Sequence, residues 1–155
     1  MESSNRVSSP VVQKIVVRKD LNMRKGKIAA QVAHASNSPI MELLQQSLIL
    51  MNRLPESTHN CRDSDYMKFV EKFHKYNHIV TEWKYSGSTK IVLGCDSKDQ
   101  LVELINKGKS LNIPTYPIVD YGLTEFHGVN TLTCCAFGPY YRDQIDEITN
   151  SLNLI

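Results

Sequence analysis

The sequence predicts an α/β fold, in which a mixed four-stranded sheet lies between helical layers as a three-layer α/β/α sandwich. Short apolar segments rich in β-branched residues alternate with longer segments whose apolar residues recur at helical spacing. The expected order is β, α, α, β, α, β, β, α, with a right-handed crossover between the first two strands. With 155 residues, 41% apolar and 22% charged, the chain is long enough for one domain with a hydrophobic core.

The N-terminal residues 1–12 contain several serines and Pro10, so we expect a flexible tail, followed by a single domain over residues 13–155. The first strand is expected at Lys14 to Arg18. Its consecutive β-branched residues Ile15, Val16 and Val17 suit a strand that is buried on both faces. We therefore place it in the centre of the sheet.

A helix is expected to begin near Asn22 or Met23, because Asn is a good N-cap and the following KIAAQVA has high helix propensity. It can continue to Leu54, where Pro55 would end it, although Pro39 can kink or break it. Its continuation opens an extended helical segment, residues 37–82.

The rest of that segment is expected to hold a polar connection, residues 55–64, and a second amphipathic helix, Asp65 to Tyr76. Basic and aromatic side chains alternate here and beyond. One interpretation is that they stack on and neutralise a nucleic acid, and the other is that the aromatics are core and the lysines a solvated face. These side chains are Lys68, Lys72, His74, Lys75, Tyr76, His78, Trp83, Lys84 and Tyr85.

The second half of the chain predicts three more strands and two helices. Ser97 and Gln100 form an SxxQ capping box before one helix, and Gly138 with Pro139 is expected to turn the chain into the other. Pro114 and Pro117 place the third strand at an edge or in an irregular position. The strands are Lys90 to Cys95, Thr115 to Val119 and Thr131 to Phe137, and the last helix is Tyr141 to Leu152.

Composition narrows the classes of protein. The N-terminus lacks the apolar core of a signal peptide, and no apolar run approaches the roughly 20 residues that span a bilayer, so we expect a cytoplasmic protein without a membrane partner. The cysteines (Cys61, Cys95, Cys134 and Cys135) show no metal-ligand spacing and are expected to be reduced thiols.

Positive charge is concentrated between Arg18 and Lys27. Five cations and one acid give this stretch a net charge of +4, whereas the whole chain carries +2. The first turn of the expected helix is therefore cationic, although a helix N-terminus already carries about half a positive charge. Such a turn indicates a phosphate or oxyanion site, and the alternative is a solvated basic turn.

On that helix Lys27, Gln31 and His34 share one face. His34 is a candidate general base, but a histidine in this position is more often a structural hydrogen-bonding residue. Asp120 follows the third strand, and an Asp before a Gly such as Gly122 is more often a turn residue that bonds its own backbone. If the first and third strands end at the same edge of the sheet, Lys25, Lys27, Asp120 and Thr124 converge there.

The run VVRKDLNMRKGKIAAQVAHAS resembles the opening signature of type II peptidyl-tRNA hydrolases, VVR-x-DL-x-M-x-KGK-x-AAQ-x-x-HA. The resemblance returns in Trp83 with Gly87 and Lys90, in DYGLT (Asp120 to Thr124), in FGP (Phe137 to Pro139) and in the closing IDEITNSLNLI. It covers residues 14–36 and 83–155 well. Residues 37–82 match poorly and are longer than the usual connection.

The resemblance implies a peptidyl-tRNA hydrolase, which cleaves the ester between a peptide and the terminal ribose of tRNA and so recycles tRNA from stalled translation products. It implies no metal or cofactor. The catalytic residues would be Lys27, Asp120 and Thr124. Lys27 would stabilise the oxyanion or the leaving group, and Asp120 would activate or orient the water. Thr124 would give a hydrogen bond that fixes either Asp120 or that water. Substrate contacts are expected from Lys19, Arg24, Lys25, Gln31 and His34, the cations holding tRNA phosphates.

The chain departs from the family pattern D-A-G-R-T-Q, because it has Tyr121, Leu123 and Glu125 at the second, fourth and sixth positions. The usual Arg is lost and a Glu is gained, which removes positive charge beside the expected site. An alternative reading is therefore a non-catalytic relative that serves as an RNA-binding or protein-binding module. The long segment could cap the site, contact RNA, or form an oligomer surface such as that of a homodimer.

Overall fold

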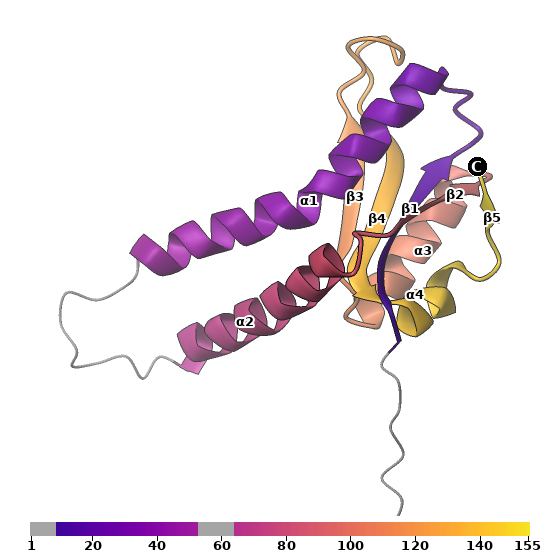
Figure 1. The fold of residues 1–155 in the computed structure, drawn as a ribbon. Coiled ribbons are helices and arrows are strands. Elements are labelled where there is room, and N and C mark those ends of the chain that lie inside the picture. Colours follow the sequence, from indigo (N-terminus) through magenta and orange to yellow (C-terminus); the bar gives the residue numbers. More distant parts are fainter. Residues whose placement is uncertain (1–8, 53–63) are drawn as a thin grey trace, which may run out of the picture.

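The computed structural model describes residues 9–52 and 64–155 and confirms the α/β class (Figure 1). Its sheet has the strand order β3-β4-β1-β2-β5, so within the described residues it has five strands rather than the expected four. Helices α1 and α2 cover one face and α3 and α4 the other. The elements are β1 (Val11–Arg18), α1 (Lys25–Asn52), α2 (Ser64–Tyr85), β2 (Lys90–Cys95), α3 (Lys98–Ser110), β3 (Thr115–Asp120), β4 (Thr131–Tyr141), α4 (Arg142–Thr149) and β5 (Asn153–Leu154).

Strand β1 is central, as predicted, and all eight of its residues are buried. It pairs in parallel with β2 and antiparallel with β4. It begins at Val11, which pairs with Tyr141. The expected flexible tail, residues 1–12, was therefore two residues too long at its C-terminal end. The rest of that tail, residues 1–8, lies outside the described residues.

Helix α1 begins at Lys25, so the prediction of an N-cap at Asn22 is wrong. Asn22 has φ +47° and lies in a turn in which its amide donates to the carbonyl of Lys19. This turn lets the chain reverse before the helix starts. The helix continues through Pro39 to Asn52 and is bent between its two halves (Figure 1), as expected where a proline removes a backbone donor. Its expected end at Leu54 and Pro55 lies outside the described residues.

Helix α2 is longer than predicted, since it runs to Tyr85. Its buried residues, Ile79, Val80 and Trp83, all lie in its C-terminal half and pack with Val11 and Leu43. Trp83 also donates from Nε1 to the carbonyl of Thr89, at 3.0 Å. Trp83 is therefore core, and a role for it in stacking on a nucleic acid is wrong.

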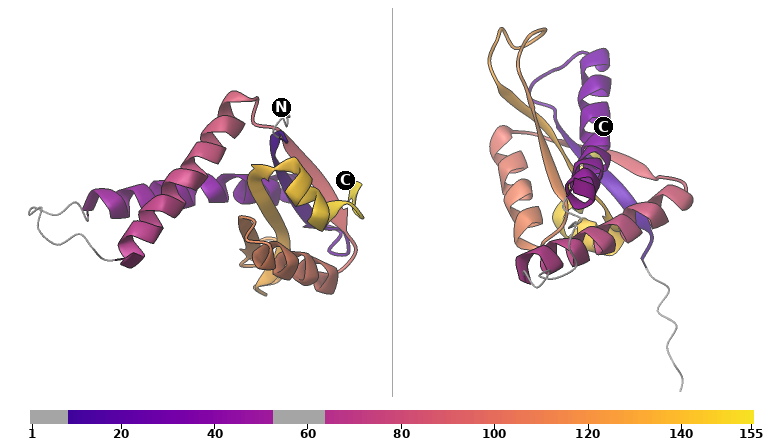
Figure 2. Two further views of the ribbon diagram at one scale, coloured as in Figure 1. Left: turned by 90° about the horizontal axis from the view of Figure 1, so that it is seen from below. Right: turned by 90° about the vertical axis from the view of Figure 1, so that its left-hand side faces the viewer.

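The outer halves of α1 and α2 extend beyond the sheet (Figures 1 and 2). Residues Ile40, Leu44, Leu48 and Met51 form one apolar stripe along α1, and each is between 44% and 66% exposed. Leu43, on the adjoining face, is buried against α2. The long middle segment therefore adds a surface that the sheet does not cover.

The N-cap of α3 at Ser97 is confirmed, because Ser97 Oγ accepts a hydrogen bond from the Gln100 amide at 3.1 Å, but the reciprocal bond of the capping box differs, since Gln100 Oε1 accepts from the Asp96 amide. Strand β3 lies at the sheet edge, as its prolines predicted. Strand β4, in contrast, does not end at Gly138. The Gly138 amide donates to the carbonyl of Pro114, and a β-bulge lets the strand continue to Tyr141 beside β1.

The last helix is therefore shorter than predicted, and α4 ends at Thr149. The residues after it form β5, which pairs antiparallel with β2 and supplies the strand that the sequence did not predict. Cys134 and Cys135 are buried on opposite faces of β4, as alternation along a strand requires, and burial raises the pKa of both thiols. Among the helices in the described ranges, none combines the length and apolarity that a membrane span requires.

Candidate functional site

The site is formed where β1 and β3 end. Both strands pair antiparallel with β4, so they are parallel to each other and their carboxyl ends share one edge of the sheet. Residues 19–24 lead from β1 into the first turn of α1, while Asp120 is the last residue of β3. The expected meeting of Lys27 with Asp120 and Thr124 is confirmed, whereas Lys25 makes no hydrogen bond or ion pair to them among the described residues.

Lys27 is the centre of this meeting. Its Nζ lies 2.5 Å from Asp120 Oδ2 and 3.1 Å from Thr124 Oγ1. The side chains of Lys27 and Asp120 are only 12% and 13% exposed, whereas Thr124 is exposed. The three predicted catalytic side chains therefore form one hydrogen-bonded group that opens to solvent at Thr124.

Asp120 is held from several sides. Its Oδ1 accepts the Gly122 amide at 2.9 Å, and its Oδ2 accepts the Gln31 amide at 2.8 Å as well as the Lys27 ammonium. The hydrogen bond from Lys27 holds the pKa of this carboxyl below its ordinary value, and the two amides act in the same direction against the effect of burial. Asp120 is thus both a turn residue and an ionised partner of Lys27.

Gln31 is 2% exposed and lies beneath Asp120. Its Oε1 accepts a hydrogen bond from Thr133 Oγ1 at 2.7 Å, which fixes the amide with its nitrogen toward Asp120. Thr133 lies on β4 and is fully buried. The sequence showed that Gln31 shares a face with Lys27, but nothing in it pointed to Thr133.

The loop after Asp120 is shaped by Gly122, which has φ +78°. A Cβ there would lie 2.6 Å from the Val129 amide nitrogen, so no side chain fits. The loop brings the Phe126 ring to 5.5 Å from Lys27 Nζ, a cation–π contact that the sequence did not reveal. Leu123, at the position where the family pattern has Arg, is 88% exposed.

The basic residues before the helix are partly engaged. Arg18 is buried and makes two hydrogen bonds to Asp20, so it braces the turn rather than facing solvent. The predicted substrate residues Lys19 and Arg24 pair with Asp96 at 2.7 Å and Glu125 at 2.6 Å, respectively.

Lys25 opens the first turn of α1 and is exposed. His34 also lies exposed on α1 and lines a hollow of about 460 Å³ with Asn37 and Met41. No hydrogen bond joins its ring to Lys27 or Asp120 in the part of the chain that the structure describes. This position favours contact with a bound molecule over a share in the Lys27 group.

The described residues contain no group of three His, Cys, Asp or Glu side chains that could hold a metal ion. The Lys27 group offers an ammonium, an ionised carboxylate and a hydroxyl at a solvent-facing rim. This combination can orient a water molecule and stabilise a developing oxyanion.

Comparison with known proteins gives a consistent result. The family model described as "Peptidyl-tRNA hydrolase PTH2" matches residues 11–155. Curated proteins named "Peptidyl-tRNA hydrolase" are similar over nearly their whole length. One is from Methanopyrus kandleri and is 34% identical, with a match that covers 92% of this chain and 97% of that protein. Two others are from Metallosphaera sedula (33% identity, 91% of this chain and 97% of that protein) and Sulfurisphaera tokodaii (35%, 91% and 95%).

Proposed function

The chain belongs to the peptidyl-tRNA hydrolase PTH2 family and is a hydrolase that acts on peptidyl-tRNA, and we propose that Lys27, Asp120 and Thr124 carry out the reaction. The observation that carries this proposal is the hydrogen-bonded group that these side chains form at the carboxyl ends of β1 and β3. Water attacks the ester carbonyl carbon, the bond to the ribose oxygen breaks, and the products are a peptide carboxylate and a tRNA hydroxyl.

The hydrogen-bonding capacity of each group supports its role. A lysine ammonium has three donors, and Asp120 and Thr124 take two of them, so one remains for the carbonyl oxygen or the leaving ribose oxygen. Asp120 has about four acceptor positions, of which Lys27, Gln31 and Gly122 fill three. The fourth, on Oδ1, can accept a hydrogen bond from the attacking water.

The lowered pKa of Asp120 bears on how that water is used. A carboxylate of low pKa is a weak base, so Asp120 orients the water and accepts its proton only as the new bond forms. Thr124 accepts from Lys27, which leaves its own hydroxyl proton free to hold the water or the substrate carbonyl. We assign Gln31 to positioning Asp120 rather than to the substrate contact expected from the sequence, since its side-chain nitrogen donates to Asp120 and its oxygen accepts from Thr133 in the interior.

Substrate binding follows from the cationic turn. Lys25 and the helix N-terminus face solvent without an acidic residue in the first turn, which suits a phosphate close to the ester. Lys19 and Arg24 would exchange their present partners for tRNA phosphates, and His34 would contact the bound molecule from the adjoining hollow. We place this activity in the cytoplasm, where translation supplies the substrate.

We further propose that two copies associate through the apolar stripe of α1. The stripe consists of the exposed apolar residues Ile40, Leu44, Leu48 and Met51. This composition fits the core of a protein interface better than an RNA-binding surface. Sedimentation analysis of the protein and of Leu44→Lys/Leu48→Lys tests this, and a wild type that remains monomeric at high concentration refutes it.

The test of the activity is to incubate the protein with labelled N-blocked aminoacyl-tRNA and to follow release of the blocked amino acid. We expect release well above buffer and a loss of it in Asp120→Asn. Release equal to buffer, together with tight tRNA binding, would leave the non-catalytic RNA-binding module as the remaining interpretation.

A further inference from the structure

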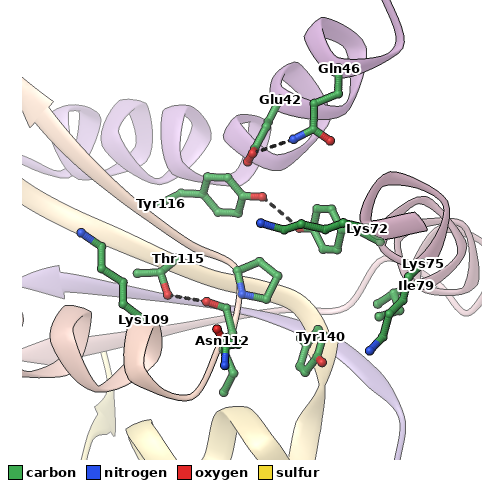
Figure 3. A pocket seen from close by; sticks show the side chains of 13 residues that line it. Glu42, Gln46, Lys72, Lys75, Ile79, Lys109, Asn112, Thr115, Tyr116 and Tyr140 are labelled. Carbon is green, nitrogen blue, oxygen red and sulfur yellow. Dashed lines mark hydrogen bonds between the residues drawn. The ribbon is translucent and has the colours of Figure 1, made fainter. Parts of the chain in front are cut away.

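A second feature lies away from the Lys27 group. A cavity of about 470 Å³ opens between the outer part of α1, helix α2, the end of α3 and the start of β3 (Figure 3). Three lysines line it: Lys72 and Lys75 from α2, and Lys109 from α3. In Figure 3, Lys72 extends from its helix across the opening, and Lys109 lies on the opposite side, with its nitrogen directed away from Lys72.

The charge of this cavity is not balanced. Glu42 is the one acidic residue among the lining side chains, and three lysines against it leave a net charge of +2. Within residues 9–52 and 64–155, none of the three lysines makes an ion pair. Lys107, two residues earlier, donates to the carbonyl of Glu147, so Lys109 differs from it in facing the cavity.

Other lining groups are polar but neutral. The hydroxyl of Tyr116 donates to that of Tyr76 at 3.2 Å, and burial raises the pKa of both, so neither adds negative charge. The end of α3 contributes the partial negative charge of a helix C-terminus, which offsets only part of the lysine charge. The cavity is therefore suited to an anion with several negative groups.

The cavity adjoins the hollow that His34 lines, and neither is lined by Lys27 or Asp120. The hollow that His34 lines shares Glu42 and Tyr116 with it. Lys27, His34 and Glu42 follow one another along α1, and the fifteen residues from Lys27 to Glu42 span about 22 Å of helix axis. A polynucleotide chain that runs from the Lys27 group along α1 as far as Glu42 would reach the cavity lined by Lys72, Lys75 and Lys109.

We propose that Lys72, Lys75 and Lys109 form a second phosphate-binding site, which holds the RNA backbone of the substrate at a distance from the ester bond. The proposal rests on the proposed function, because the ligand is the tRNA part of the same substrate. RNA is favoured over the peptide part, since every nucleotide carries a phosphate whereas a peptide has no regular negative charge. The cations hold the tRNA in register and leave the chemistry to the Lys27 group.

The experiment compares the wild type, the double variant Lys72→Gln/Lys75→Gln and the control Lys84→Gln. Lys84 is an exposed lysine on α2 nine residues after Lys75, two and a half turns away and thus on the opposite side of the helix. The affinity for uncharged tRNA is measured between low and high NaCl. Rates are measured with N-blocked aminoacyl-tRNA and with the corresponding N-blocked aminoacyl ester of adenosine, which has no RNA backbone.

We expect the double variant to bind tRNA more weakly and the slope of log affinity against log salt to fall by about 0.7 to 0.9 for each lysine removed. KM for the tRNA substrate should rise at unchanged kcat, and the rate with the adenosine ester should stay the same. The control should match the wild type in all of these. An unchanged salt slope, or an equal loss in Lys84→Gln, would overturn the proposal.

Two further outcomes are informative. Binding of inorganic pyrophosphate that the double variant loses, together with an unchanged tRNA slope, would assign the site to a small anion and overturn the RNA assignment. If the wild type hydrolyses neither substrate, the proposed function fails, while the tRNA binding measurements still decide whether these lysines hold RNA.

Discussion

Lys27 and Asp120 are separated by 93 positions in the sequence, and yet Nζ of the first lies 2.5 Å from Oδ2 of the second. Strands β1 and β3 create this contact, because both run antiparallel to β4 and end at one edge. The pair is largely shielded from solvent and is open to it through Thr124.

Lys27→Met and Asp120→Asn should each lower kcat with N-blocked aminoacyl-tRNA by about tenfold or more. The two residues act as a unit, so the double variant should lose little more than the more damaging single change. Arg142→Met is the control, because it removes an exposed cation of α4 that lies 3.9 Å from Asp146. Losses that multiply in the double variant would show that the two groups act independently.

The free energy of unfolding should depend on Asp120 in an acidic range of pH. The Lys27 ammonium lowers the pKa of Asp120 in the folded protein, whereas the pKa of an Asp in the unfolded chain is about 3.9. Its stabilising contribution is therefore complete above that pH and is lost as the pH falls through the lower folded pKa. Denaturant unfolding of the wild type and Asp120→Asn should show a constant difference near neutrality that shrinks below about pH 4.

The same linkage should appear in the rate. In Lys27→Met the ammonium is gone, so the pKa of Asp120 should rise. The acidic limb of kcat/KM should then move to higher pH than in the wild type. An acidic limb at the same pH in both proteins would show that Asp120 is not the group whose ionisation the rate reports.

Thr133→Val should lower kcat although Thr133 touches no substrate. It removes the hydrogen bond that orients Gln31, which in turn holds Asp120. Thr149→Val is the control, because Thr149 is also buried and its hydroxyl, far from the site, donates to the carbonyl of Ile145 and accepts from Lys14 Nζ. Both changes should cost about 1–3 kcal/mol of unfolding free energy.

Only Thr133→Val should change kcat, and Thr133→Ser, which keeps the hydroxyl, should restore it. Equal losses of kcat in the Thr133 and Thr149 variants would instead indicate a general effect of lower stability. KM should change little in either variant.

The parts of the fold that follow from local sequence were predicted well. Strand β1 is marked by its β-branched run, and α3 by the box of Ser97 and Gln100. The predicted start of α1 at Asn22 or Met23 was wrong, because the left-handed turn at Asn22 depends on how the chain leaves β1. The predicted end of β4 at Phe137 was wrong, because the local sequence indicates a turn at Gly138. The strand continues there through a tertiary contact, in which the Gly138 amide donates to the carbonyl of Pro114.

Some contacts of the site could likewise be predicted from the sequence, and others could not. The meeting of Lys27 with Asp120 follows from strand direction, so sequence and topology were enough to predict it. The bond between Gln31 and Thr133 joins residues 102 positions apart in the core, and no periodicity marks such a pair. The partners of Lys19 and Arg24 were also hidden, because Asp96 and Glu125 lie in segments that only the fold brings near.

The ion pair of Arg24 with Glu125 should limit the affinity for tRNA. Glu125 is 15% exposed and lies 2.6 Å from the guanidinium of Arg24, so it competes with a phosphate for that cation. Glu125→Gln should free Arg24 and strengthen tRNA binding several-fold at low salt, with a salt slope steeper by up to about 0.9. Leu123→Arg should add to this, because position 123 is 88% exposed and can present a new cation beside the site.

Glu103→Gln, which removes an exposed carboxylate of α3, controls for the change in net charge. Filter binding of uncharged tRNA at several salt concentrations measures all three. Because these residues lie at the rim, the changes should act on KM while kcat stays near the wild-type value. If Glu125→Gln and Glu103→Gln strengthen binding equally, net charge alone accounts for the gain and Arg24 is not a phosphate ligand.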